Sequence, residues 1–201
     1  MYFPYFRGRQ YELLALKELA ASGLITNSVL PVIEPVKLIP ALNNSLSAFQ
    51  SAMLPVGLIL NPNVGDLTDE PETISQLLGK LSVNPNIIPS VLLNESAEES
   101  MEKLRDRDID ESDTLIVFNN RDYLDIYREL FSSAPKYTLC PDERFIRRAV
   151  SQNKVIFENR FNKQSRNADY PADEFFQMIT CIMHRIIILD LEIILSSGTN
   201  I

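Results

Sequence analysis

Residues 29–34 read VLPVIE, a β-branched apolar run that closes on a charged side chain, and five similar runs follow it along the 201-residue chain. They are PVGLILN at 55–61, NIIPSVLLN at 86–94, DTLIVFN at 113–119, KYTLC at 136–140 and KVIFE at 154–158. Helical stretches separate most of the runs, and this alternation is typical of a parallel sheet covered by helices. The pattern predicts an α/β fold of about six parallel strands, an incomplete (β/α) barrel of the TIM type.

The segments between the runs have helical spacing and helix-ending residues. Gly23 is expected to end the first helix, and Pro71 to begin a later one. Pro89 lies inside the third run and predicts a bulge or an edge strand there, because proline cannot donate to a ladder. The expected helices cover 9–22, 39–53, 96–105, 121–131 and 142–150, besides the one that begins at Pro71.

The charge balance disfavours nucleic acid as a direct partner. The chain has 19 basic and 27 acidic residues, a net charge of −8, and such a surface repels phosphate backbones. Arg144, Arg147 and Arg148 form one local basic cluster, which is either a solvated helix face or a small anion-binding surface.

The remaining composition is typical of a cytoplasmic protein with a substantial core. Apolar residues make up 45% of the chain, and two cysteines do not form a disulfide framework. The N-terminus has no signal-peptide layout, so export is not expected. Residues 178–195 are apolar, but they contain four ionisable side chains, and we therefore expect no membrane span.

Two carboxylates close predicted strands and are the candidate catalytic residues. Glu34 ends the first run and Glu158 ends the sixth, where α/β barrels place their sites. Either carboxylate can act as a general base or hold a divalent metal. The alternative is a charge that is solvated or paired with an arginine. Asp142 follows the fifth run and is either a ligand-binding carboxylate or the N-cap of the next helix.

Asparagines close three other runs and predict a polar mouth on the same rim. Asn61, Asn94 and Asn119 are amides suited to a small polar ligand, although asparagine at a strand end also serves ordinary turn chemistry. Arg7 and Arg9 flank Gly8. They can clamp a phosphate or carboxylate, or pin the first helix through a carboxylate such as Glu12.

Residues 160–170 form a long polar segment, predicted to be a lid or a partner contact that includes Arg160 and Arg166. No phosphate-binding loop, dinucleotide motif or zinc-hydrolase motif is present, so the sequence identifies no metal ligands and leaves any cofactor unknown. The single histidine, His184, lies in the atypical C-terminal tail, which argues against a histidine-based triad.

Three segments resemble the beta-protein family of bacterial and phage-type proteins. They are MYFPYFRGRQYELLALKEL at the N-terminus, LPVIEPVK, and NKQSRNADYPADEFF, and the resemblance covers residues 1–176. It implies an accessory or binding component of a bacterial mobile-element or phage-defence locus, with a nuclease-like protein encoded nearby as partner. The residues themselves leave a second function open, a metal-assisted hydrolase or lyase that uses Glu34 and Glu158 on a phosphate- or sugar-containing substrate.

Residues 177–201 depart from the family pattern and form an isoleucine-rich tail. With suitable codons, one added T in the codons of Phe175 and Phe176 restores a family-like continuation. We therefore expect a barrel-like domain over 1–176 and a tail that is truncated or translated out of frame. Sequencing the gene tests this hypothesis, and a gene without a family-like downstream frame would refute it.

Overall fold

The computed structural model describes residues 1–67 and 73–157, in which seven parallel strands alternate with helices. The strands are β1 (Tyr5–Phe6), β2 (Val32–Ile33), β3 (Val56–Ile59), β4 (Ile87–Leu92), β5 (Leu115–Val117), β6 (Tyr137–Cys140) and β7 (Lys154–Ile156). The helices are α1 (Gln10–Ala21), α2 (Pro40–Ser51), α3 (Thr73–Leu81), α4 (Ala97–Arg105), α5 (Leu124–Leu130) and α6 (Arg144–Ala149), with 3₁₀ turns η1 (Glu111–Asp113) and η2 (Arg121–Tyr123).

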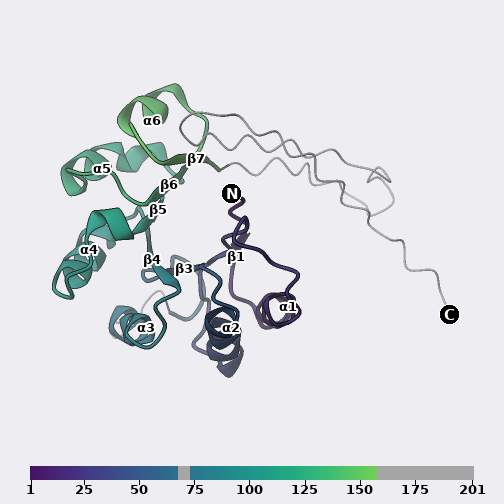
Figure 1. Cartoon of the computed structure of the whole chain (residues 1–201). Coiled ribbons are helices and arrows are strands. Elements are labelled where there is room, and N and C mark those ends of the chain that lie inside the picture. Colours follow the sequence, from purple (N-terminus) through teal and green to yellow (C-terminus); the bar gives the residue numbers. More distant parts are fainter. Residues whose placement is uncertain (68–72, 158–201) are drawn as a thin grey trace, which may run out of the picture.

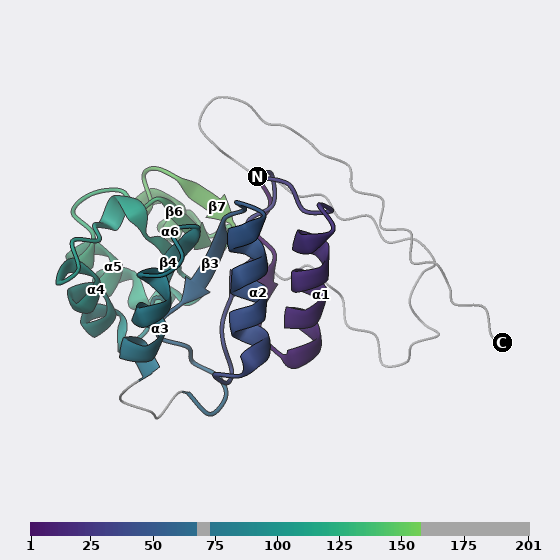
Figure 2. The same cartoon turned by 60° about the horizontal axis from the view of Figure 1, so that its bottom comes forward.

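Each strand pairs in parallel with the next one along the chain, in the order β1 to β7. The sheet curls, and the helices lie around its outer side (Figure 1). Figure 2 shows α1 and α2 side by side along the outer surface, where they pack against each other. The incomplete (β/α) barrel predicted from the sequence is confirmed.

The strand count differs from the prediction by one, because β1 precedes α1. Tyr5 pairs with Val32 and Phe6 with Ile33 at the edge of the sheet. Two strand residues between Pro4 and Arg7 are too few to produce a recognisable period, so the sequence pattern did not reveal this strand.

The prediction of a bulge or an edge at Pro89 is wrong. Pro89 lies in β4, in the interior of the sheet, and pairs with Leu58 of β3 in unbroken register. Pairing of β4 with β5 begins only at the next residue, Ser90. Amides alternate between the two neighbouring strands, and Leu93 donates to Val117 of β5. The nitrogen of Pro89 therefore faces the β5 side before that ladder starts, and no sheet hydrogen bond is lost.

Side chains alternate between two apolar layers. In β2, Ile33 is fully buried against the helices, whereas Val32 is fully buried in the concave interior of the sheet. Two ring contacts cross that interior: Tyr5 meets Phe157 with centroids 5.4 Å apart, and Phe3 meets Tyr137 at 5.0 Å. The inner layer is therefore closed by aromatic side chains from the two ends of the sheet. Its buried members are Phe3, Leu30, Val32, Ile59, Ile88, Leu92, Leu115, Val117, Leu139 and Val155.

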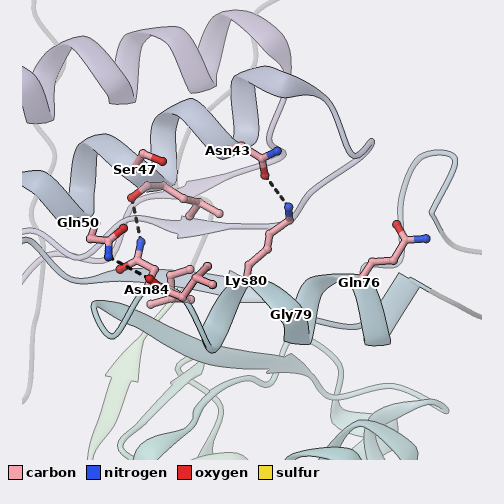
Figure 3. A pocket seen from close by; sticks show the side chains of 10 residues that line it. Asn43, Ser47, Gln50, Gln76, Gly79, Lys80 and Asn84 are labelled. Atoms are coloured by element: carbon pink, nitrogen blue, oxygen red, sulfur yellow. Dashed lines mark hydrogen bonds between the residues drawn. The ribbon is translucent and has the colours of Figure 1, made fainter.

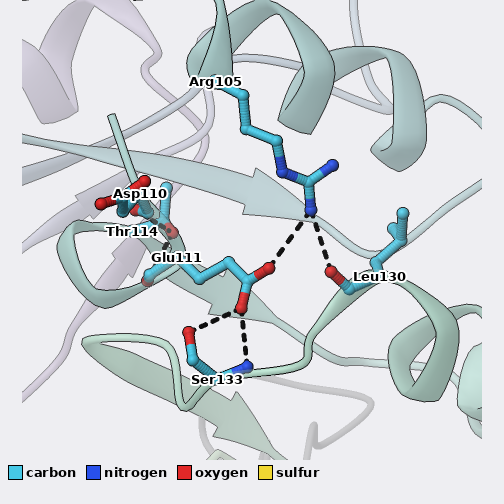
Figure 4. Close-up of polar contacts among 6 residues, drawn as sticks. All are labelled: Arg105, Asp110, Glu111, Thr114, Leu130 and Ser133. Atoms are coloured by element: carbon cyan, nitrogen blue, oxygen red, sulfur yellow. Dashed lines mark hydrogen bonds and ion pairs between the residues drawn. The ribbon is translucent and has the colours of Figure 1, made fainter. Parts of the chain in front are cut away.

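One polar network lies at the amino ends of β5 and β6, opposite the predicted site (Figure 4). Glu111 accepts hydrogen bonds from the Ser133 Oγ at 2.7 Å, the Ser133 amide at 2.8 Å and the Arg105 guanidinium at 3.3 Å. Arg105 also donates to the carbonyl of Leu130 at 3.0 Å. Burial raises the pKa of Glu111, but the hydrogen bonds from Ser133 and Arg105 outweigh it and hold the pKa below its usual value.

Glu111→Gln is expected to destabilise the fold by about 1 kcal/mol near neutral pH, because a charged acceptor of three hydrogen bonds becomes a neutral one. The folded-state pKa is depressed, so the unfolded chain binds more protons in acid. The stabilisation is therefore present above the unfolded pKa and is lost as pH falls through the folded one. Urea unfolding at several pH values should show the difference between wild type and variant shrinking below about pH 4.5. Glu129→Gln, an exposed carboxylate on α5, is the control and should change little.

Several sequence predictions fall outside the described residues. They concern Glu158, Arg160 and Arg166, the boundary at residue 176 and the tail at 177–201, so these stay predictions. Within 1–67 and 73–157, no helix has the length and apolar character needed to cross a membrane.

Candidate functional site: the polar rim at the carboxyl ends of the strands

Four predicted site residues follow four neighbouring strands and lie at the same edge of the sheet. Glu34 comes directly after β2, and Asn61, Asn94 and Asn119 come two residues after the ends of β3, β4 and β5. Parallel strands place their carboxyl ends together, which is where open and closed α/β sheets carry their sites. We call this edge the rim.

Glu34 is buried at the rim, with 4% of its surface exposed, and both carboxylate oxygens are engaged. Oε2 accepts from the Tyr5 hydroxyl and Oε1 from the backbone amide of Asn63, each at 2.8 Å. The carboxylate is thus held by two neutral donors, one from β1 and one from the loop after β3. Hydrogen bonds to a charged acceptor are the stronger kind, so this arrangement fixes the carboxylate in one position.

Tyr5 is a rim residue that sequence reasoning missed. Burial raises the pKa of its phenol strongly, the charge of Glu34 and the hydrogen bond to it raise it further, and the charge of Arg7 opposes them. The phenol therefore stays protonated and acts as a donor to Glu34. Tyr5 lies on a strand of only two residues, so no periodic signal in the sequence could have identified it.

Asn61 extends the β3–β4 ladder with its side chain. Its Oδ1 accepts from the Leu92 amide at 2.9 Å, and its Nδ2 donates to the Leu92 carbonyl at 2.7 Å. Nδ2 also lies 2.8 Å from Oδ1 of Asn94, which in turn accepts from the amide of Ser96 at 3.0 Å and its hydroxyl at 2.9 Å. Both side chains are buried. The bonds of Asn94 to Ser96 are turn chemistry, whereas Asn61 bonds to the backbone of the neighbouring strand.

The asparagines after β5 are exposed and differ from this pair. Asn119 lies at the rim in contact with solvent. Its neighbour Asn120 is the N-cap of η2, where its Oδ1 accepts from the amide of Asp122 at 3.0 Å. The rim thus has a buried, internally bonded half at β2–β4 and an open half at β5.

Two glycines bring the rim loops together. Gly8 has φ +57°, and an added Cβ there would lie 3.1 Å from the Cα of Pro35. Gly65 has φ +84°, and its Cβ would lie 2.4 Å from the carbonyl oxygen of Val36. The loops after β1 and β3 therefore pack directly on the loop after β2. At Gly65 the approach leaves no room for a Cβ, and at Gly8 a Cβ would be tight.

The predicted anion clamp by the two arginines at the N-terminus stays a prediction. Arg7 and Arg9 are both exposed, and Arg9 uses its backbone amide, not its guanidinium, to donate to Oε2 of Glu12 at 3.1 Å. The expectation that a guanidinium would pin α1 through Glu12 is therefore wrong. Arg7 lies close enough for its charge to act on Tyr5.

Asp142 is not the N-cap of α6, so that interpretation is wrong. The cap position belongs to Glu143, one residue later, and Asp142 instead forms an exposed ion pair with Arg147 at 3.1 Å. Cys140, the last residue of β6, is fully buried, and burial raises the pKa of its thiol to about 11. A thiol in that state is not a nucleophile at neutral pH.

A groove of about 340 Å³ lies on the outer layer between α2 and α3, away from the rim (Figure 3). Lys80 donates to the Asn43 side chain at 2.5 Å, Gln50 to the Val83 carbonyl at 3.0 Å, and burial lowers the pKa of Lys80. The polar groups thus bind one another across the groove. Its lining is Asn43, Leu46, Ser47, Gln50, Gln76, Gly79, Lys80, Val83, Asn84 and Ile87.

No protein-family model, curated protein or solved structure matches this chain. Within the described part of the chain, no three His, Cys, Asp or Glu side chains gather in a metal-binding arrangement.

Proposed function

We propose that this protein is an accessory binding component of a bacterial mobile-element or phage-defence locus, and that it acts with a nuclease-like protein encoded nearby. The resemblance to the beta-protein family supplies the type of locus and the partner. We further propose that it works in the cytoplasm, that its contact with nucleic acid passes through the partner, and that the open half of the rim can take a small polar ligand.

The state of Glu34 is the observation that carries this proposal. The strongest candidate for a catalytic carboxylate is 4% exposed and holds hydrogen bonds from Tyr5 and Asn63 on both oxygens. Asn61 and Asn94 are likewise bound to their neighbours. At β2–β4 the polar groups of the rim are already hydrogen-bonded within the chain and form a rigid surface, which favours recognition of a partner over chemistry on a bound substrate.

Co-expression with the product of the adjacent gene tests the proposal. We expect the two proteins to co-purify through size-exclusion chromatography at a fixed ratio, and the complex to survive Glu34→Gln. Failure of the full-length protein to bind the adjacent gene product would refute the accessory function.

Glu34→Gln is expected to change the free energy of unfolding by about 1 kcal/mol or less. The amide oxygen can keep the bond from Asn63, and the amide nitrogen can donate to the Tyr5 hydroxyl in place of accepting from it. Glu34→Ala leaves both donors buried and unpaired, and should cost about 2–3 kcal/mol. Chemical denaturation measures both values. Equal losses in the two variants would show that the charge itself, and not the hydrogen bonds, stabilises the rim.

A second function, a metal-assisted hydrolase or lyase acting on a phosphate- or sugar-containing substrate, is favoured by one observation. Glu34 stands at the carboxyl end of a barrel strand, the position at which such enzymes carry catalytic carboxylates. A divalent metal that binds the folded protein would raise its melting temperature. A Mg²⁺- or Mn²⁺-dependent rise that Glu34→Gln abolishes would favour the enzyme and count against the accessory function.

A further inference from the structure

We propose that the outer edges of β1 and β7, which pair with no further strand in the described residues, receive one β-strand from the partner protein, and that a helix of the partner next to that strand lies between α6 and α1. This inference rests on the proposed function, since it says where on this chain the partner binds. It follows from the backbone register at both edges, from the ring contacts between them and from the location of exposed apolar side chains.

The open edge of β7 is defined by its pairing with β6. Thr138 donates to the carbonyl of Asn153, and Phe157 donates to the carbonyl of Cys140. Because backbone groups alternate along a parallel ladder, Val155 and Phe157 direct their amides to β6, while Lys154 and Ile156 direct theirs away from it. In the described chain no strand pairs with β7 on that side.

The open edge of β1 follows from its pairing with β2 in the same way. The carbonyls of Tyr2, Pro4 and Phe6 accept from the amides of Leu30, Val32 and Glu34 in turn. The backbone groups of Phe3 and Tyr5 therefore face away from β2. Both edges present alternate donors and acceptors, and both strands run in the same direction, so an added strand can pair in parallel with either.

Aromatic contacts hold these two edges opposite each other. Tyr5 on β1 meets Phe157, directly after β7, and Phe3 meets Tyr137 on β6. The rings fill the inner side of the barrel where the sheet ends. A strand that enters from outside would thus pack on an apolar surface that is already formed, so binding would not have to order that surface.

Exposed apolar side chains gather on the elements that flank these edges. Among the described residues, six of the eight large hydrophobics that are exposed lie there, including Tyr11 on α1 at 84% and Phe145 on α6 at 59%. Figure 1 shows α1 and α6 as the first and last helices of the outer layer, with no described helix between them. Tyr11 and Phe145 expose more than half of their surface on these two helices, so this sector exposes apolar surface that a helix could bury. The six are Tyr2, Tyr11, Leu14, Leu19, Leu24 and Phe145.

Charge further specifies the partner segment. Arg144 and Arg148 are exposed on α6 beside Phe145, whereas Lys154 on β7 donates its Nζ to the Arg147 carbonyl at 2.7 Å. The strand should therefore be β-branched and apolar, and its adjacent helix should combine an apolar stripe toward α1 with acidic residues toward α6. Such main-chain pairing gives affinity, and the side chains give specificity.

Hydrogen–deuterium exchange on the full chain, alone and in complex with the adjacent gene product, tests the inference. We expect the amides of Lys154, Ile156 and Tyr5 to exchange quickly in the free protein and to become protected in the complex. In the free protein, the amides of Val155 and Phe157 should already be protected, because they are bonded to β6. Protection of Lys154 and Ile156 in the isolated chain would mean that another segment or copy of this chain occupies the edge, and would overturn the inference.

Ile156→Pro provides a second test, because it removes only an amide that faces the open edge, a position at which sheets tolerate proline. Ile156→Ala is the matched control, which loses the same side chain but keeps the N–H. We expect the proline variant to bind the partner about tenfold or more weakly than the alanine variant, through a lost hydrogen bond and the steric bulk of the ring.

The outcomes separate the two proposals. If no complex forms with the wild-type chain, the accessory function fails and this inference fails with it. If a complex forms but the proline and alanine variants bind equally, or protection appears elsewhere, the accessory function stands and the edge is not its binding site. Should the proline variant fail to fold, the exchange pattern of the wild-type complex decides the matter alone.

Discussion

Replacing Ile33 by aspartate is expected to leave the chain unfolded. The side chain is fully buried in β2, between the sheet and the outer helices. The substitution loses about 1.5–3 kcal/mol of apolar burial and adds a carboxylate without a partner, which costs several kcal/mol more. A loss above about 4–5 kcal/mol consumes most of the stability of an ordinary domain.

Circular dichroism and thermal denaturation measure this effect directly. Ile33→Val keeps the strand and removes one methylene, so a loss of only about 0.5–1.5 kcal/mol is expected for this control. A cooperative melt of Ile33→Asp near the wild-type temperature would contradict the burial of β2 on both faces.

Gly65→Ala is expected to cost about 2–5 kcal/mol and to separate the loops after β2 and β3. The backbone at Gly65 has φ +84°, which disfavours a side chain by about 1–2 kcal/mol. The new Cβ would also lie 2.4 Å from the Val36 carbonyl oxygen and 2.7 Å from its Cα, and overpacking against backbone adds about 1–3 kcal/mol. Urea unfolding measures the loss, and amide exchange at Asp66, which donates to Val36, reports whether the loops part.

Gly23→Ala is the matched control for this variant. Gly23 also has a positive φ, +68°, but nothing lies within 4 Å of its added Cβ. The Gly23→Ala variant should therefore lose only the stability that the positive φ costs a side-chain-bearing residue, about 1–2 kcal/mol. If both variants lost the same amount, the contact between Gly65 and Val36 would not matter for stability.

The architecture was predictable because its signal is local. Each of the six apolar runs forms a strand, and Gly23 ends α1 with the positive φ that its position required. The strand β1 was missed because two residues have no period. The role of Pro89 was misjudged because its effect depends on where pairing with β5 begins, and that register is a property of the assembled sheet.

The sequence predicted where the rim lies, but not which of its polar groups are hydrogen-bonded within the chain. Residues that close parallel strands must share an edge, so the sequence placed Glu34 beside Asn61 and Asn94. It did not reveal that Tyr5 and the Asn63 amide hold Glu34, or that Asn61 bonds to the backbone of Leu92. Those partners lie 29 or 31 residues away along the chain, and only the curl and stagger of the strands bring them into contact.

By itself, the sequence determined the parallel α/β class, the strand order of neighbours and the edge at which polar side chains collect, because short-range periodicity and chain direction control all three. Tertiary structure alone decided which of those polar groups are hydrogen-bonded within the chain. Glu34 and Asn61 are satisfied within the chain because burial makes an unpaired polar group costly, and the partners that satisfy them come from adjacent strands. The open edges of β1 and β7 in the described residues were likewise decided by the tertiary structure, since an edge exists only once the strands have assembled into a sheet.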